Sequence, residues 1–163
     1  MLQIESTPFI IEHNKMIAEF MGWRPSVIER DIKLYYFPNS ETGEYANTCK
    51  LADLRGMKYH DSWDWLMPVV EKIETMPIPL TEKYKKGFLK NATEANIEIY
   101  TLYDSREEFK CWNFRVEFVM GKHICDNSER WATKLAVTYQ AVIKFILWYK
   151  EYQKELKLND KSI

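Results

Sequence analysis

The chain has 163 residues, of which 46% are hydrophobic and 15% are aromatic, and such a chain can bury a core without disulfides or a metal. Its 23 basic and 24 acidic residues leave a formal net charge of -1. No overall positive field attracts nucleic acid, so we do not expect a nucleic-acid partner, and we expect one folded domain over residues 1–163.

The cysteines and the start of the chain indicate a cytoplasmic protein. Cys49, Cys111 and Cys125 are odd in number and irregularly spaced, which makes a poor disulfide framework. The first residues lack the basic and apolar regions of a signal peptide. The longest apolar stretch, 135–149, contains polar residues and is too short to span a bilayer, so we expect no membrane partner.

In the first third of the chain, the pattern predicts a helix, a strand and a loop. Apolar residues at helical spacing predict a helix from about Glu12 to Gly22, where the glycine and the following Pro25 would end it. Residues 32–37 are rich in β-forming side chains and predict a strand. Residues 40–58 have weak periodicity and predict mostly loop.

A second helix is predicted from about Ser62. Asp61 and Ser62 are both favourable N-cap types, and an apolar stripe follows at helical spacing. Pro68 predicts a bend at that residue or a helix start close to Asp64. Pro77 ends this helix, and residues 81–91 then predict a short helix or an exposed loop.

The last part of the chain predicts two strands and a long helix. The β-rich segment 96–103 and the alternating segment 111–118 are joined by polar residues that suit a hairpin. Apolar residues from 135 to 149 then predict a helix that begins near Ser128, with Asp126 or Ser128 as its cap. The charged tail, 154–163, is expected to fray.

These elements predict the α+β class, with a small, mainly antiparallel sheet packed with three principal helices. The last helix should cover one face of the second strand, and the helix near Leu66–Ile73 should share that core. The side chains expected on the covered strand face are Trp112, Phe114, Val116 and Phe118. The helix side chains expected to be nearly fully buried are Leu135, Val142 and Ile146. Arg115 and Glu117, on the other strand face, should stay more exposed unless the first helix covers them.

Three segments of the chain are distinctive: NKMIAEFMG at 14–22, YHDSWDWLMPVVEKIE at 59–74 and AVIKFILWY at 141–149. They resemble segments of small proteins encoded by phages and prophages of the Bacteroidetes. These proteins are related to the phage ABA-sandwich group, so the resemblance implies a helix–sheet–helix sandwich in the cytoplasm of a host cell. It transfers no functional residue, because the group has no established chemistry. This sequence is longer than typical proteins of that group at 24–58 and 75–91, which we interpret as insertions.

A basic and aromatic segment is the first candidate binding site. Lysines interleave with two aromatic rings, as in sites that hold phosphates and stack on bases. Its residues are Lys83, Tyr84, Lys85, Lys86, Phe88 and Lys90. The segment predicts that the protein binds a nucleotide-like ligand. A phage protein could sequester a host immune signal in this way. The alternative is a solvated loop with its rings folded onto the core.

The six tryptophans suggest a second kind of site. Trp63 and Trp65 are two residues apart on a predicted helix, so they cannot share one buried face. An exposed aromatic residue often marks a contact, and we interpret Trp63 and Trp23 as candidate contacts with a protein partner or a second copy of the chain. We favour binding of this kind, without catalysis, as the function.

Two further clusters were weighed for catalysis and for metal binding. His60, Asp61 and Asp64 would suit a hydrolase-like acid–base site if they converge in a pocket, but the two carboxylates also stand where helix caps stand. A zinc set would need a fourfold convergence of cysteine and histidine, without a C-x2-C knuckle. The residues of that set are Cys49, Cys111, His123 and Cys125. We expect no metal and no cofactor.

Overall fold

A computed structural model describes residues 8–25, 34–36, 51–85, 91–104, 111–118, 123–126 and 133–160. Within these ranges the helices are α1 (Pro8–Met21), α2 (Trp63–Thr75) and α3 (Lys134–Asp160). The strands are β1 (Arg24–Pro25), β2 (Leu34–Tyr36), β3 (Leu51–Asp53), β4 (Ile78–Pro79), β5 (Glu94–Ala95), β6 (Ile97–Asp104), β7 (Cys111–Phe118) and β8 (His123–Asp126). They pair antiparallel in the orders β1-β2-β3, β4-β5 and β6-β7-β8.

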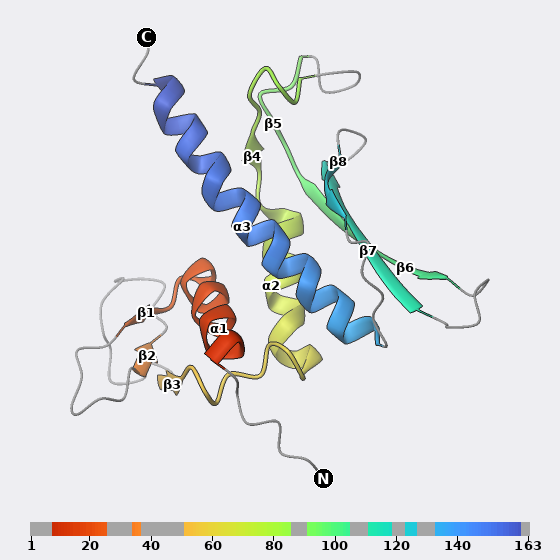
Figure 1. Ribbon diagram of the computed structural model, residues 1–163. Helices are drawn as coiled ribbons and strands as arrows, with labels where there is room; N and C mark the ends of the chain where they lie inside the picture. Colours follow the sequence, from red (N-terminus) through yellow and green to blue (C-terminus); the bar gives the residue numbers. More distant parts are fainter. Residues whose placement is uncertain are drawn as a thin grey trace.

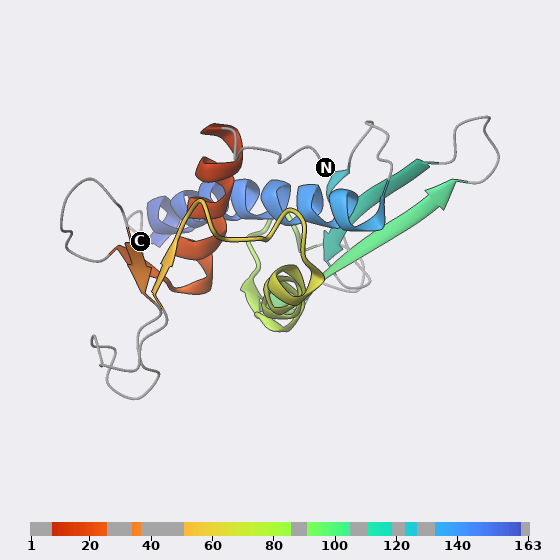
Figure 2. The same cartoon turned by 90° about the horizontal axis from the view of Figure 1, so that it is seen from below.

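The predicted α+β class is confirmed, and three helices packed with small antiparallel sheets are consistent with a helix–sheet–helix sandwich. Helix α3 crosses the centre of the molecule, between α1 on one side and the β6-β7-β8 sheet on the other (Figure 1). Helix α2 runs close to α3 and contacts strand β6 (Figure 2). Among the described residues, both α1 and α2 therefore pack against α3.

Helix α1 begins earlier than predicted and ends where predicted. Pro8 occupies its first turn, where the missing backbone donor costs nothing. At the other end Gly22 has a φ of 93°, which an L side chain rarely adopts, so glycine suits this position. The amide of Gly22 bonds the Glu19 carbonyl at 3.0 Å, and that of Trp23 bonds the Ala18 carbonyl at 2.9 Å. This pattern is a Schellman cap.

A lysine from another helix completes that cap. The Lys72 ammonium of α2 donates to the Phe20 carbonyl at 2.6 Å and lies 4.9 Å from the centre of the Phe20 ring. A cation is favourable at a helix C-terminus because the macrodipole is negative there. Burial lowers the pKa of Lys72. Lys72 therefore joins the end of α1 to α2.

The short strands are where structure and expectation differ most. Strand β2 lies inside the predicted strand 32–37, but β3 falls in 40–58, which we expected to be mostly loop. Strands β4 and β5 pair across the segment 79–94 and were not predicted. Each of these two strands has only two residues, which is too short for a periodic pattern. Its β conformation depends on pairing with the other strand.

The central hairpin was predicted closely. Strand β7 covers 111–118 as expected, and it pairs with β6 so that Ile97 faces Phe118 and Ile99 faces Val116. Strand β8 was missed, and its register shifts between Val116 and Glu117 of β7. The amide of Ile99 donates to the Glu74 carboxylate of α2 at 3.3 Å, which occupies a donor at the edge of β6.

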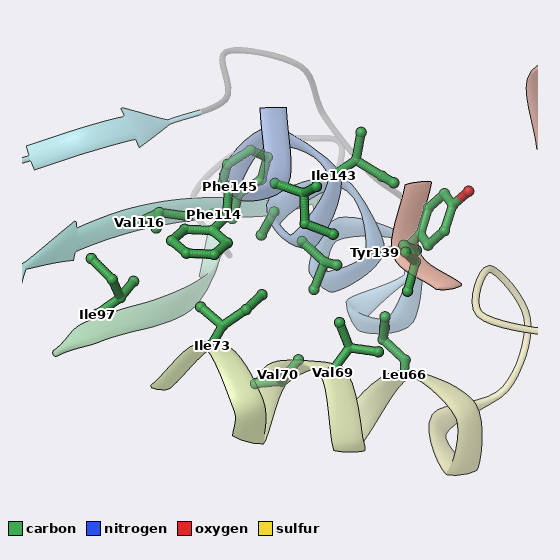
Figure 3. Close-up of a cluster of buried hydrophobic side chains, with 14 of the residues drawn as sticks. Leu66, Val69, Val70, Ile73, Ile97, Phe114, Val116, Tyr139, Ile143 and Phe145 are labelled. Carbon is green, nitrogen blue, oxygen red and sulfur yellow. The ribbon is translucent and has the colours of Figure 1, made fainter. Parts of the chain in front are cut away.

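One hydrophobic core joins the helices to this hairpin (Figure 3). Phe114, Val116 and Phe118 are at most 2% exposed, as expected for the covered strand face. The α2 stripe contributes four buried side chains: Leu66, Val69, Val70 and Ile73. Arg115, on the opposite strand face, is exposed and Glu117 is half-buried. The side chain of Trp112 lies outside the described part.

The first turn of α3 differs from the prediction in its first residue, in its cap and in the burial of Leu135. The helix begins at Lys134, and its cap is Thr133, whose hydroxyl accepts a hydrogen bond from the Ala136 amide at 3.1 Å. Asp126 cannot be the cap because it lies in β8, and Ser128, the other predicted cap, lies outside the described residues. Leu135 is only half-buried because it lies in the first turn of the helix, although Val142 and Ile146 are fully buried as expected.

The tail expected to fray, 154–163, continues α3 as far as Asp160, and residues 161–163 lie outside the described part. Leu156 is half-buried against the core, and Lys154 forms an ion pair with Glu151 at 2.7 Å one turn earlier. Both contacts favour helix. Within the described ranges, no helix combines the length and the apolar character needed to cross a membrane.

Candidate functional site

A groove of about 340 Å³ lies between the C-terminal half of α3 and the segment after β4. Its size falls in the range of small-molecule and side-chain pockets. The side chains that line it are Lys83, Tyr84, Ile124, Trp148, Glu151, Tyr152 and Glu155. Three elements far apart in the sequence therefore build one concave site: the segment after β4, strand β8 and helix α3.

The base of the groove is an aromatic cluster. Trp148 and Tyr152, one turn apart on α3, stack with ring centres 4.9 Å apart and an interplanar angle of 13°. Tyr84 meets both rings edge to face, at 6.1 Å and 5.5 Å, and packs on Phe118 of β7 at 5.1 Å. Such arrangements follow the charge distribution of aromatic rings. The rings form a continuous wall from the sheet to the helix, in which Tyr84 and Tyr152 are at most 5% exposed and Trp148 is half-buried.

Hydrogen bonds hold these rings in place. The Trp148 indole donates to the Tyr84 hydroxyl at 3.2 Å. The Tyr152 hydroxyl donates to the Pro79 carbonyl at 2.6 Å and accepts from the Thr81 amide at 2.9 Å. The chain from β4 to Tyr84 is thus fixed to α3 by its backbone. Because contacts within the chain hold these rings, binding there requires little side-chain ordering.

Charged groups occupy the rim of the groove. The Lys83 ammonium lies 5.3 Å from the centre of the Tyr84 ring, within the range of a cation–π contact. Glu151 is paired with Lys154, whereas Glu155 is exposed at the rim. The groove therefore combines an apolar wall with one basic side chain and two acidic ones.

The predicted basic segment is only partly at this groove. Lys83 and Tyr84 line it, but Tyr84 is 5% exposed and packs into the core, as the alternative reading expected for its ring. Lys85 is half-buried and pairs with Glu82 at 2.9 Å. The other three candidates lie outside the described residues: Lys86, Phe88 and Lys90.

The two tryptophans proposed as partner contacts differ. Trp63 is 38% exposed, and Met67, one turn later on α2, is 46% exposed. Trp65 instead packs edge to face on Tyr59 at 5.3 Å, which confirms that the pair does not share one buried face. Trp23 is half-buried against the core.

A buried polar cluster joins α1, α3 and the segment before α2. His13 is 7% exposed, and its Nδ1 lies 3.1 Å from the Tyr139 hydroxyl. The His60 ring lies on Tyr139 as well, at 6.3 Å. Burial lowers the pKa of His13, against an opposing effect of Glu12, and burial raises the pKa of Tyr139. The protonated phenol can therefore donate to a neutral imidazole.

Asn14, next to His13 on α1, is fully buried. Its amide nitrogen donates to the carbonyls of Leu54 and Met57 at 2.8 Å and 2.9 Å. These bonds hold the turn after β3 against α1. Burial of an amide side chain is tolerated when it supplies donors to backbone carbonyls that would otherwise lack them.

The acid–base candidates do not meet in the way a hydrolase site needs. The Nδ1 atom of His60 is buried and has no hydrogen-bond partner among the described residues. Asp61 and Asp64 are exposed, and Asp64 lies in the first turn of α2, where a carboxylate stabilises the helix. Ser62 is the N-cap residue, but its side chain makes no capping hydrogen bond.

The candidate zinc set cannot be placed as a whole. Cys49 lies outside the described residues, as do the side chains of Cys111 and His123. Cys125 is half-buried. Over the described ranges, no three His, Cys, Asp or Glu side chains come together in a way that could hold a metal ion.

Five residues that line the groove were not predicted from the sequence: Ile124, Trp148, Glu151, Tyr152 and Glu155. Trp148 and Tyr152 are four residues apart, so helical spacing alone could have predicted that their rings adjoin. No sequence signal brings Tyr84 to the same place, because 64 residues separate it from Trp148.

Comparison of the chain with protein-family models, curated proteins and solved structures finds no match.

Proposed function

We propose that this chain is a phage or prophage accessory protein that acts by binding, and that the aromatic groove on α3 receives a side chain of a protein partner. The observation that carries the proposal is the half-buried Trp148 ring in the groove, which the buried rings of Tyr84 and Tyr152 hold in place. Aromatic residues in concave, ordered sites contribute most of the binding energy at protein interfaces. The phage origin rests on the resemblance of the three sequence segments.

The charged residues at the rim of the groove favour a partner that presents both an apolar group and polar groups. A protein segment can place an apolar or aromatic side chain on the wall while its polar groups meet Lys83 and Glu155. A catalytic role has less support, because His60 lies against Tyr139 while Asp61 and Asp64 are exposed. Binding therefore accounts for more of the described geometry than hydrolysis does.

Site-specific photo-crosslinking tests this proposal. A photoreactive amino acid at Glu155 would sit on the rim, whereas the same group at Gln153, two residues earlier on α3, is exposed but does not line the groove. After irradiation in host cells, we expect one discrete protein adduct from position 155 and none from position 153. Equal adducts from both positions, or none from either, would contradict a partner at the groove.

A second candidate function is sequestration of a nucleotide-like small molecule. It is favoured by the position of Lys83 and Tyr84, the two members of the predicted basic segment that line the groove. A phosphate would contact the lysine and a base would lie on the aromatic wall. The carboxylates of Glu151 and Glu155 oppose a phosphate, so we place this function second.

A thermal-shift screen with cyclic and linear nucleotides separates the two functions. A ligand at a hundredfold its dissociation constant stabilises the folded state by about 2.7 kcal/mol. If the groove holds a nucleotide, Lys83→Gln should abolish the shift, whereas Lys85→Gln should preserve it because Lys85 is already paired with Glu82. A panel without any stabilising nucleotide would leave the protein partner as the supported function.

A further inference from the structure

Two glutamates stand beside the half-buried Trp148 ring on the groove side of α3. Glu151 and Glu155 follow Trp148 by three and seven residues, so the three side chains share one face of the helix, and all three line the groove. The two carboxylates are about one helical turn apart along that face. The groove therefore places a pair of negative charges next to a partly exposed aromatic ring.

The groove keeps a negative charge although Lys83 also lines it. One lysine and two glutamates give the lining a formal charge of -1. The Lys83 ammonium lies 5.3 Å from the centre of the Tyr84 ring, so it already has a partner within the chain. Glu151 pairs with Lys154, but both side chains are at least 69% exposed, and such an ion pair contributes little energy. Glu155 forms no ion pair with another described residue.

A flat cation matches these groups better than any other protein side chain does. A guanidinium group is planar and weakly hydrated, so one of its faces can stack on an indole, the ring that attracts cations most strongly. Its five N–H donors lie in the plane of the group and can bond two carboxylates at once. An aromatic or aliphatic side chain would cover the ring but leave both carboxylates without a counterion. A lysine ammonium has no flat face.

We infer that the groove receives an arginine side chain of the partner protein, whose guanidinium stacks on Trp148 and bonds the carboxylates of Glu151 and Glu155. The inference rests on the proposed function and names the chemistry that the partner presents. Ile124 of β8, half-buried in the lining, adds an apolar contact for the aliphatic stem of the arginine. The carboxylates that oppose a phosphate thus become the groups that select the occupant.

An NMR titration of the full chain with a capped arginine, N-acetyl-arginine methylamide, tests the inference. The indole N–H signal of Trp148, identified by its loss in Trp148→Phe, should shift at millimolar ligand, whereas the Trp65 signal should stay unchanged. Capped lysine carries the same charge without the flat group, and capped citrulline has nearly the same shape without the charge. We expect weaker binding of lysine and no binding of citrulline.

A charge-removing variant adds a second readout. Glu155→Gln should raise the dissociation constant of capped arginine by about tenfold, because a charged hydrogen bond is lost. The matched control is Glu71→Gln, at an exposed position of α2 outside the groove, which should leave the dissociation constant unchanged. Both glutamates are exposed, so circular dichroism should show native melting for both variants. A Trp148 signal that does not respond to arginine, or that responds equally to lysine or citrulline, would overturn the inference. Unchanged affinity in Glu155→Gln would overturn it as well.

These outcomes are separate from those of the crosslinking experiment. A protein adduct from position 155 together with no response to capped arginine would keep the protein partner and remove arginine as the occupant. Arginine binding without an adduct would contradict the protein partner and keep the chemistry of the groove. The photoreactive group at position 155 replaces one carboxylate, but its capture is irreversible and Glu151 remains to bind the guanidinium.

Discussion

His13 and Asn14 are polar residues that the structure buries, although polar side chains on a helix usually face solvent. Both lie on α1 and both are at most 7% exposed. Reading by periodicity assigns polar side chains to the solvent face, because it considers only neighbours along one helix. Their partners, Tyr139 and the carbonyls of Leu54 and Met57, come from distant parts of the chain. The sequence therefore could not predict this part of the core.

The buried imidazole predicts a pH dependence of stability. Burial lowers the pKa of His13 below the ordinary value of 6.5, so the unfolded chain binds a proton more readily than the folded chain. The contribution of His13 to the unfolding free energy is therefore complete above that ordinary value and is lost as the pH falls below it. Urea unfolding at about pH 7.5 and about pH 5 should show this loss.

His13→Gln removes the titrating group and should reduce the difference in unfolding free energy between the two pH values. The variant itself is expected to be less stable at both values, because the contacts with Tyr139 and Phe9 change. The pH difference is the informative quantity. If His13→Gln kept the full wild-type dependence on pH, the buried imidazole would not be its source.

At the scale of elements, long periodic segments were predictable and short strands were not. Strand β7 alternates over eight residues, and α3 repeats its apolar residues over several turns, so each pattern excludes the alternatives. Strands β4, β5 and β8 have two to four residues and no period to detect. The groove depends on them, because β4 directs the chain toward Tyr84 and β8 supplies Ile124.

The connection between α1 and α2 predicts an effect of Lys72. Lys72→Met keeps the aliphatic stem but removes the ammonium from the Phe20 carbonyl and ring. We expect the unfolding free energy to fall by about 1–2 kcal/mol, from the lost charged hydrogen bond and the lost helix-end charge. Lys144→Met, at an exposed position of α3, is the matched control and should change it little. Equal effects of the two substitutions would refute the capping role.

The packing of α3 on the sheet predicts a large difference between adjacent residues. Ile146 is fully buried, and Leu147 beside it is 46% exposed. Ile146→Ala should lower the unfolding free energy by about 2–4 kcal/mol through the cavity it leaves. Leu147→Ala should cost less than about 1 kcal/mol. Chemical denaturation measures both, and a cost for Leu147→Ala that equals the cost for Ile146→Ala would contradict the orientation of α3.

At the scale of the whole molecule, α3 connects the core to the groove. Val142 and Ile146 pack inside, whereas Trp148 and Tyr152, further along the helix, form the aromatic wall. The sequence predicted the helix and its burial, but it assigned the residues beyond 153 to a frayed tail and so missed the rim at Glu155. The charged sequence after residue 153 gives no sign that the segment of Lys83 and Tyr84, distant in the sequence, lies beside it.

The most direct test of binding at the groove follows the indole N–H signals of the six tryptophans by NMR. The protein is titrated with the crosslinked partner, or with any nucleotide that stabilises it, and Trp148→Phe assigns its signal. Because the Trp148 indole donates to Tyr84 inside the groove, its signal should shift most. The Trp65 indole, packed on Tyr59 away from the groove, should stay unchanged. A bound complex with shifts at Trp63 or Trp65 and none at Trp148 would contradict the assignment of the groove as the binding site.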